Sequence, residues 1–205
     1  MVDPVACTAD QVAVRARLAA TTVGIIGLGG LGSNASMMLV RSGVRRFVLA
    51  DFDTVEPSNL NRQLYFPDQL GRLKADALAE TLTRIEPALD LTLVREPITA
   101  GNITAVFGGV DVLLEAVDKA ETKEMLVAAA SDLLPGTPFV WVSGLAGCSS
   151  ANDIVTSRLG ETLWVVGDLS SDIRDGLPLI SSRVMVAAAH EAHIATRILL
   201  GLPDA

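Results

Sequence analysis

The sequence places Gly27-Leu-Gly-Gly-Leu-Gly32 directly after an apolar run, residues 23–26, and directly before a stretch with helical spacing, residues 33–41. Between a strand and a helix, G-x-G-x-x-G spacing is typical of a turn that receives a phosphate, because glycines let backbone N–H groups and the helix N-terminus approach it closely. Asp51 follows the next apolar run, where a carboxylate can accept hydrogen bonds from both hydroxyls of a ribose. Together these features predict a nucleotide site. The alternative is a tight turn that needs small residues for packing, with Asp51 as a charge at a strand end.

Strand, glycine turn, helix and strand form a βαβ unit, and the rest of the chain continues this pattern. The sequence therefore predicts an α/β fold with a Rossmann-like, doubly wound, mostly parallel sheet and helices on both faces. Its 205 residues are enough for one core, so we expect a single domain over residues 1–205. The expected strands are residues 23–26, 47–50, 91–95, 110–116 and 138–142, with a hairpin around Gly160 in residues 149–166, and the expected helices include residues 10–20, 33–41, 74–85 and 181–200.

The bulk composition excludes several classes of partner. A net charge of −8 and a pI near 4.7 leave no cationic face for nucleic acid or for an anionic membrane. No apolar run reaches the ~18 residues of a membrane span, and no basic segment leads into an apolar stretch at the start of the chain, so we expect a cytoplasmic protein. Two cysteines, Cys7 and Cys148, cannot form a four-thiolate zinc site, and zinc is not expected.

A polar segment after Asp51 carries residues that suit phosphoryl chemistry, among them Arg62 and Lys74. When a carboxylate attacks an α-phosphate, negative charge gathers on the phosphoryl oxygens and on the departing pyrophosphate, so the catalyst must supply fixed cations. Arg62 and Lys74 can be those cations, whereas a dehydrogenase has no use for them. Asp118, at the end of a later apolar run, offers a carboxylate for Mg²⁺ at the carboxyl edge of the sheet.

Four motifs in this order resemble the ThiF/MoeB/HesA family of E1-like enzymes. They are the glycine turn, Asp51-Phe-Asp-Thr-Val, Ser58-Asn-Leu-Asn-Arg-Gln63 and Gly71-Arg-Leu-Lys74, and their spacing agrees with the family over residues 23–123. The compact length, together with Ser143-Gly-Leu-Ala-Gly and Val166-Gly-Asp168, resembles the short second family of ThiF proteins.

The resemblance implies an adenylyltransferase that uses Mg-ATP to activate the C-terminal glycine carboxylate of a ubiquitin-like sulfur-carrier protein ending in Gly-Gly. The products would be an acyl-adenylate and pyrophosphate. A ThiS-like carrier and thiamine thiazole synthesis are the implied setting, and a homodimer is an arrangement found in the family.

The resemblance also implies roles for residues of this chain. Asp51 would bind the ribose, Lys74 would stabilise the transition state, and Asp118 would take the metal. Asp53 is close enough to Asp51 to contact the ribose or the metal, and Arg72 is at most a helper. The implied catalytic residues are Arg62, Lys74 and Asp118, and the implied nucleotide-binding residues are Gly27, Gly29, Gly30, Gly32, Asp51, Asp53, Asn59, Arg62, Gln63 and Lys74, with Asn59 and Arg62 on the phosphates.

Three departures from the family pattern affect this interpretation. Lys119 follows Asp118 where the family usually has asparagine, and the paired Cys-x-x-Cys zinc motifs of many relatives are missing from the sequence. The arginine-rich entry of the family is also missing, although Arg15 or Arg17 of a neighbouring subunit can take its place.

Other reactive side chains have simpler interpretations. Cys148 follows a predicted strand and could carry a persulfide or a thioester, but the sequence shows no group that would favour its thiolate, so we expect a plain loop residue. His190 and His193 have i, i+3 spacing and miss the H-E-x-x-H pattern of zinc sites, so we expect packed or solvated histidines.

Two rival functions stay open at this point. An NAD-dependent Rossmann oxidoreductase would fit the glycine turn and Asp51 taken alone. A nucleotide-binding partner of a carrier protein, without catalysis, would fit the unusual Lys119.

Overall fold

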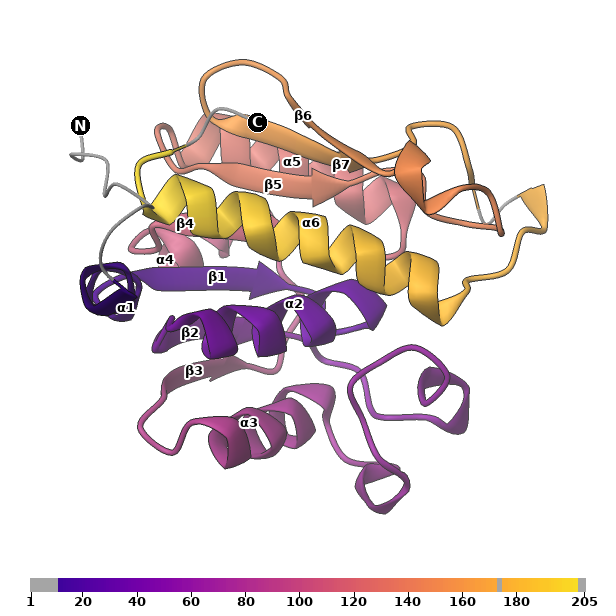
Figure 1. The fold of residues 1–205 in the computed structure, drawn as a ribbon, viewed down its shortest axis with the longest axis horizontal. Helices are drawn as coiled ribbons and strands as arrows, with labels where there is room; N and C mark the ends of the chain where they lie inside the picture. Colours follow the sequence, from indigo (N-terminus) through magenta and orange to yellow (C-terminus); the bar gives the residue numbers. More distant parts are fainter. Residues whose placement is uncertain (1–10, 173–174, 203–205) are drawn as a thin grey trace.

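A computed structural model describes residues 11–172 and 175–202, and within these residues it contains one sheet of seven strands. The strand order is β3-β2-β1-β4-β5-β7-β6, and neighbouring strands are parallel except β7 and β6 (Figure 1). The predicted α/β, doubly wound fold is confirmed. The strands are β1 (Thr22–Ile26), β2 (Arg46–Ala50), β3 (Asp90–Val94), β4 (Val112–Glu115), β5 (Phe139–Val142), β6 (Val155–Arg158) and β7 (Leu163–Gly167).

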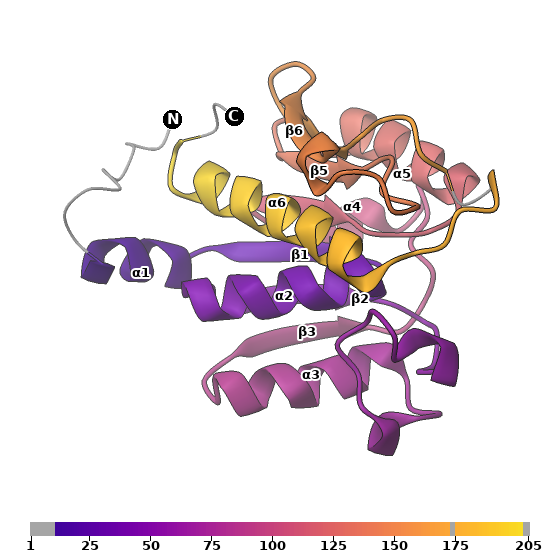
Figure 2. The same cartoon turned by 45° about the vertical axis from the view of Figure 1, so that its right-hand side comes forward.

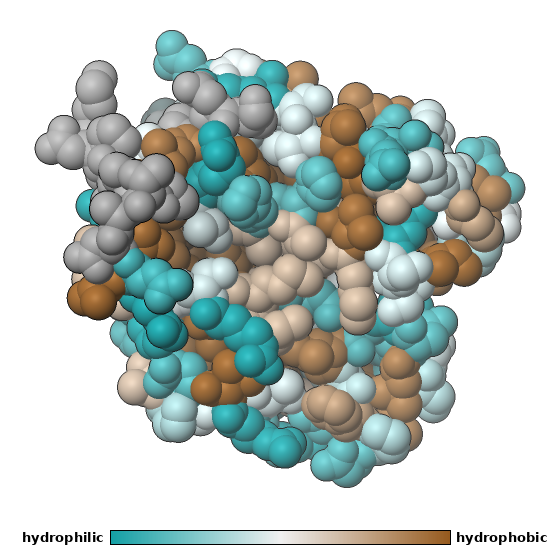
Figure 3. All heavy atoms as spheres, in the orientation of Figure 1, coloured by the Kyte–Doolittle hydropathy of each residue, from teal (hydrophilic) through white to brown (hydrophobic). Residues whose placement is uncertain are grey.

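Helices cover both faces of the sheet, as Figure 2 shows. One layer of the core is formed by the sheet with α2, α3 and α6, and the other by the sheet with α4 and α5. On the face that carries α6, hydrophilic and hydrophobic residues are mixed around a pale-brown, moderately hydrophobic patch at the centre of the view (Figure 3). The helices are α1 (Gln11–Ala19), α2 (Gly30–Ser42), α3 (Lys74–Ile85), α4 (Ile103–Phe107), α5 (Ala120–Leu133) and α6 (Ser181–Leu199).

The apolar runs of the sequence become the central strands because these strands are covered on both faces. Four of the five residues of β1 are buried, whereas the edge strand β3 has no fully buried residue. The predicted hairpin is also present, with Gly160 at φ 105° between the antiparallel strands β6 and β7. Cys7 lies outside the described residues. Within the described ranges, no helix combines the length and the hydrophobicity that a membrane crossing requires.

The order of the strands creates a crevice at the carboxyl edge of the sheet. From β1 the chain moves outward to β2 and β3, and then returns to β4 on the other side of β1. In open α/β sheets, ligands bind where the strand order reverses in this way. The glycine turn follows β1, Asp51 follows β2, and Asp118 lies just beyond β4, so the three predicted features meet at this edge.

Glu191 on α6 is a buried carboxyl group whose two oxygens have no hydrogen-bond partner among the described residues. Burial raises its pKa well above the ordinary value of 4.5, the charge of Glu115 adds to the rise, and Lys123 opposes it. The folded chain therefore keeps a proton that the unfolded chain releases, and stability should fall as the pH rises from 4.5 toward the folded-state pKa.

Replacing Glu191 by glutamine should remove this pH dependence. As the pH rises from 4.5 to the folded-state pKa of Glu191, the free energy of unfolding of the variant should exceed that of the wild type by about 1.4 kcal/mol more for each pH unit. Urea unfolding at pH 5 and pH 8 measures the difference, with Glu161→Gln as a control at an exposed position of the β6–β7 turn. A Glu191→Gln variant whose stability difference is the same at both pH values would contradict the prediction.

Candidate functional site

The segment from Asp53 to Lys74, which leads from β2 to the first residue of α3, is closed at its base and is called the site loop below. Thr54 and Leu73 form an antiparallel bridge, and Lys74 N–H donates a hydrogen bond to Asp53 O at 2.9 Å. Gly71, at φ 79°, donates its N–H to Val55 O at 2.9 Å. These bonds bring Asp53 and Lys74 together although they are 21 positions apart in the sequence.

A cavity of about 420 Å³ lies between the site loop and the turn after β4. Six of the predicted site residues line it, and four of these six carry charged side chains. The predicted glycines and Asp51 do not line the cavity but lie next to it. The lining residues are Phe52, Asp53, Thr54, Glu56, Asn59, Arg62, Gln63, Lys74 and Asp118.

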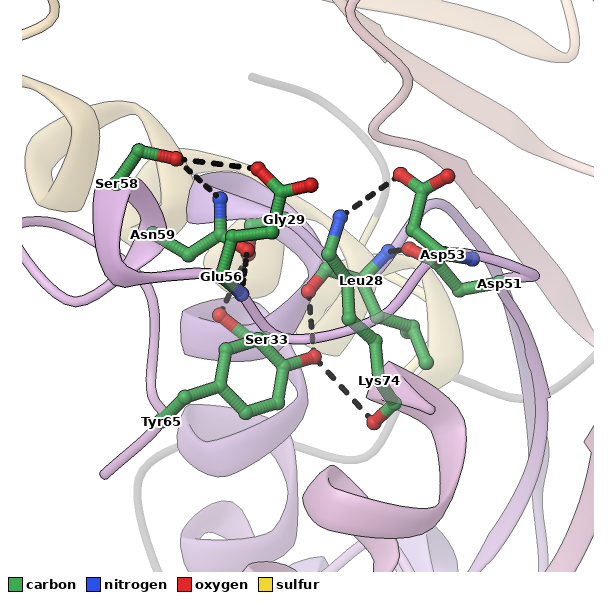
Figure 4. Close-up of polar contacts among 10 residues, drawn as sticks. All are labelled: Leu28, Gly29, Ser33, Asp51, Asp53, Glu56, Ser58, Asn59, Tyr65 and Lys74. Carbon is green, nitrogen blue, oxygen red and sulfur yellow. Dashed lines mark hydrogen bonds and ion pairs between the residues drawn. The ribbon is translucent and has the colours of Figure 1, made fainter. Parts of the chain in front are cut away.

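Lys74 is the first residue of α3 and a buried cation of the site. Only 7% of the residue is exposed, and its ammonium forms an ion pair with Asp53, with Nζ 2.9 Å from Oδ2 (Figure 4). The Asp53 side chain is 54% exposed, so one partner faces the protein and the other faces the solvent. A phosphate that enters the cavity can therefore replace Asp53 as the partner of Lys74 without a change in the backbone.

Asp51 connects the glycine turn to the site loop. Its Oδ2 accepts a hydrogen bond from Leu28 N–H at 2.7 Å, and its Oδ1 accepts one from Asp53 N–H at 2.8 Å (Figure 4). Burial raises the pKa of Asp51, while Lys74 and these two N–H groups lower it. A carboxylate has about four acceptor positions, so two remain for the hydroxyls of a ribose.

The glycine turn is compact because Gly32 packs directly against the backbone of Gly27. A Cβ atom at Gly32 would lie 1.9 Å from Gly27 O, and a Cβ atom at Gly27 would lie 2.7 Å from Ala116 O. Gly27 also has φ 88°, a conformation that side chains disfavour. No side chain caps the N-terminus of α2, so its first N–H groups can donate hydrogen bonds to an anion.

Replacing Gly32 by alanine should therefore damage both the fold and nucleotide binding. The backbone of residue 27 would have to move, and we expect a loss of about 3 kcal/mol in the free energy of unfolding. Gly109→Ala is the matched control, because a Cβ atom there would meet no atom within 4 Å. Thermal unfolding compares the two variants, and a Gly32→Ala protein as stable as the control would contradict the packing described here.

Three predicted residues of the site loop differ in how they are held. Asn59 Oδ1 accepts a hydrogen bond from Glu56 N–H at 3.0 Å and so closes a turn. Arg62 Nη1 donates to Ser58 O at 3.1 Å and to Asn61 Oδ1 at 2.8 Å, which leaves the N–H groups on Nε and Nη2 for a ligand. Gln63 Oε1 is buried with no hydrogen-bond partner among the described residues. An unpaired polar atom in a cavity lining is typical of a site that receives a polar ligand.

Asp118 and Asp53 are the carboxylates that fit a magnesium ion. Both line the cavity. In the described part of the chain, no group of three or more His, Cys, Asp or Glu residues could hold a metal by itself. Mg²⁺ in phosphoryl-transfer sites is commonly held by one or two carboxylates together with the phosphates of the substrate. The donors present therefore fit a metal that arrives with a nucleotide.

Sequence reasoning missed three side chains that tie the site loop to the glycine turn. They are Ser33, Asn34 and Tyr65. Tyr65 donates its hydroxyl to Leu28 O at 2.7 Å, and burial, with the charges of Asp51 and Asp53, raises its pKa, so the hydroxyl keeps its proton (Figure 4). The one available signal was that Tyr65 is the single tyrosine of the chain and lies in the polar loop.

A buried ion pair behind Asp118 was also missed. Glu115, fully buried at the end of β4, accepts hydrogen bonds from Lys123 Nζ at 2.5 Å and from Val117 N–H at 2.7 Å. These bonds fix the turn that carries Asp118. Burial raises the pKa of Glu115, and the Lys123 ammonium opposes this rise.

The remaining candidates lie away from the cavity. Cys148 is an exposed free cysteine, and His190 Nδ1 lies 3.0 Å from Thr156 Oγ1. Arg15 is exposed, whereas Arg17 donates to Leu199 O of its own chain at 3.2 Å. The predicted helper Arg72 forms an exposed ion pair with Glu80.

Helix α1, which contains both arginines, lies at the opposite end of β1 from the site loop (Figure 1). Neither arginine lines the cavity of its own chain.

Comparison with known proteins gives the family of this chain. Residues 6–163 match the model of the ThiF family. The chain belongs to the ThiF family. This ThiF-family chain is 38% identical to ubiquitin-like modifier-activating enzyme 5 of rice over 130 residues, which are 55% of the chain and 30% of that relative. It is 35% identical to the sulfur carrier protein ThiS adenylyltransferase of Escherichia coli over 122 residues, which are 59% of the chain and 48% of that relative.

These matches span less than half of the length of either curated relative. Solved structures agree with the fold of the ThiF-family chain. E. coli tRNA N6-threonylcarbamoyladenosine dehydratase, TcdA, in complex with ATP has a TM-score of 0.84 at 21% identity, over 93% of this chain and 90% of that one. E. coli MccB with ATP has a TM-score of 0.71 at 19% identity, over 92% of this chain and 58% of that one.

Proposed function

We propose that this chain is an ATP-dependent adenylyltransferase that activates the C-terminal glycine carboxylate of a ubiquitin-like sulfur-carrier protein. One observation supports this most directly: Arg62, Lys74 and Asp118 line the same cavity beside the glycine turn. Membership of the ThiF family supports ATP as the nucleotide, and so does the TcdA structure that contains ATP. An NAD-dependent oxidoreductase would not need these cations.

In the proposed reaction, the nucleotide phosphates lie along the glycine turn and the ribose lies on Asp51. A carboxylate oxygen of the carrier attacks the α-phosphorus and forms a new P–O bond. The bond from the α-phosphorus to the bridging oxygen breaks, and pyrophosphate leaves with that electron pair. Arg62 and Lys74 offset the negative charge that develops on these oxygens.

Lys74 must exchange its partner during this reaction. Its ammonium turns from Asp53 to a phosphoryl oxygen, a change that needs only side-chain rotation because the Lys74 backbone is held by Asp53 O. Asp53 and Asp118 would then hold Mg²⁺, which neutralises phosphate charge when bound.

The carrier and the pathway are the finer part of the proposal. We propose a ThiS-like carrier ending in Gly-Gly and a role in thiamine thiazole synthesis, which the similarity to the E. coli ThiS adenylyltransferase supports. We also propose that residues 1–205 act as one cytoplasmic domain. In a homodimer, Arg15 would be the residue presented to the neighbouring site, because Arg17 is held by Leu199 of its own chain.

The proposal is tested by incubating the protein with Mg-ATP and a purified carrier that ends in Gly-Gly. We expect mass spectrometry to show a gain equal to one AMP residue on the carrier, and no gain on a carrier that lacks the last glycine. Thermal shifts with Mg-ATP and with NAD(H) identify the nucleotide. A shift with NAD(H) alone would overturn the proposal, and so would tight carrier binding without adenylation.

A further inference from the structure

Three consecutive carbonyl groups of the glycine turn accept hydrogen bonds from side chains. Leu28 O accepts from the Tyr65 hydroxyl at 2.7 Å, Gly29 O from Ser33 Oγ at 2.5 Å, and Gly30 O from Asn34 Nδ2 at 2.7 Å. Figure 4 shows the first two of these carbonyls beside Ser33 and Tyr65. These bonds occupy carbonyl oxygens, so the first N–H groups of α2 stay available for a phosphate, whereas Leu28 N–H is already bonded to Asp51 Oδ2.

Two of these side chains also hold the backbone of the site loop. Asn34 Nδ2 donates to Arg62 O at 3.0 Å, and Ser33 Oγ accepts from Leu64 N–H at 3.1 Å. Both side chains are buried, with Asn34 1% exposed. Asparagine is unfavourable inside a helix because its side chain competes for backbone groups. Helix formation does not explain a buried asparagine at this position, whereas its hydrogen bond to Arg62, 28 positions away, does.

From this geometry we infer that Asn34 is a positioning residue, which holds Arg62 beside the glycine turn before the nucleotide binds. Each end of Arg62 is fixed separately. Its carbonyl oxygen is held by Asn34, and its guanidinium by Ser58 O at 3.1 Å and Asn61 Oδ1 at 2.8 Å. Its side-chain carbons lie against the glycine turn, with Cγ 3.5 Å from the position of a Cβ on Gly30. The inference rests on the proposed function, because it assigns a use to the position of Arg62.

Preorganised cations act most strongly when they do not have to move during the reaction. A shift of about 1 Å in a positioned group can lower the rate about a hundredfold. We therefore expect Asn34→Ala to lower carrier-dependent exchange of pyrophosphate into ATP about tenfold to a hundredfold, with little change in the Kd for ATP. Ser36→Ala is the matched control, because Ser36 is buried in the same helix and its hydroxyl donates to Gly32 O of that helix at 2.6 Å.

Hydrogen exchange supplies a readout that does not depend on activity. In Asn34→Ala and in Ser33→Ala, the amides of residues 62–65 should exchange at least about tenfold faster than in the wild type, because local opening becomes easier. Ser36→Ala should leave them unchanged. Equal exchange in the wild type and Asn34→Ala would overturn the inference, and so would the same acceleration in Ser36→Ala.

A double-mutant cycle separates positioning from a general structural role. If Asn34 acts through Arg62, then adding Asn34→Ala to Arg62→Ala should cause no further loss of exchange activity. A full additional loss would overturn the inference. If the wild type lacks pyrophosphate exchange altogether, the proposed function fails, whereas the amide exchange of residues 62–65 still decides whether Asn34 holds the loop.

Discussion

Replacing Lys74 by alanine should reduce carrier-dependent exchange of pyrophosphate into ATP at least about a hundredfold, because a buried cation aimed at developing charge contributes that much or more. Because Lys74 is only 7% exposed, a cation from the solvent cannot easily reach the position of its ammonium beside Asp53. ATP binding should stay measurable, since the N–H groups of the glycine turn remain and Asp51 keeps its two backbone hydrogen bonds from Leu28 and Asp53.

The control for this variant is Arg84→Ala. Arg84 lies exposed in the last turn of the same helix, far from the cavity lining. Its replacement removes a positive charge from α3 without touching the site, and exchange should stay close to the wild-type rate. Retained exchange in Lys74→Ala would remove this residue from the mechanism.

Replacing Lys123 by methionine should destabilise the fold more than any other substitution of a charged residue proposed here. Glu115 is fully buried, and without Lys123 its charge has no ion-pair partner among the described residues. Removing one partner of a buried ion pair costs about 3–5 kcal/mol. Urea unfolding at neutral pH measures the loss, and Lys119→Met serves as the control because Lys119 is exposed on the same segment.

The pH dependence of the Lys123→Met variant distinguishes this cause from a simple packing defect. Burial already raises the pKa of Glu115, and removal of the ammonium raises it further. The folded variant then binds a proton that the unfolded chain releases, so its stability should fall as the pH rises above the ordinary glutamate pKa. The double variant with Glu115→Gln should recover most of the loss. A loss of stability that is the same at all pH values, and that Glu115→Gln does not restore, would point to a packing defect alone.

The sequence was sufficient to predict the sheet and the edge at which the site lies. Apolar runs bounded by glycine specify buried strands, and the carboxyl ends of parallel strands must meet at one edge. For this reason Asp51 and Asp118 could be assigned to one crevice although 67 positions separate them in the numbering. The placement of Arg62 and Lys74 there depended on the family resemblance as well.

The supporting contacts could not be predicted in the same way. Asn34 and Arg62 are 28 positions apart, and Tyr65 and Leu28 are 37 apart, so no local pattern relates them. Each contact depends on how the site loop folds back on the glycine turn. No sequence pattern indicated that Asp51 would accept hydrogen bonds from two backbone N–H groups, because a strand-end aspartate looks the same whether it faces a ribose or a neighbouring peptide group.

Because the base of the site loop is closed, the distance between Asp53 and Lys74 does not depend on the number of residues that join them. The bridge between Thr54 and Leu73 keeps the two charges adjacent, while the exposed Asp68 lies in a short turn far along the segment. Extra residues inserted near Asp68 would enlarge the excursion without moving either charge. Changes in the outer part of the segment can therefore alter the surface beside the cavity while Asp53 and Lys74 keep their spacing.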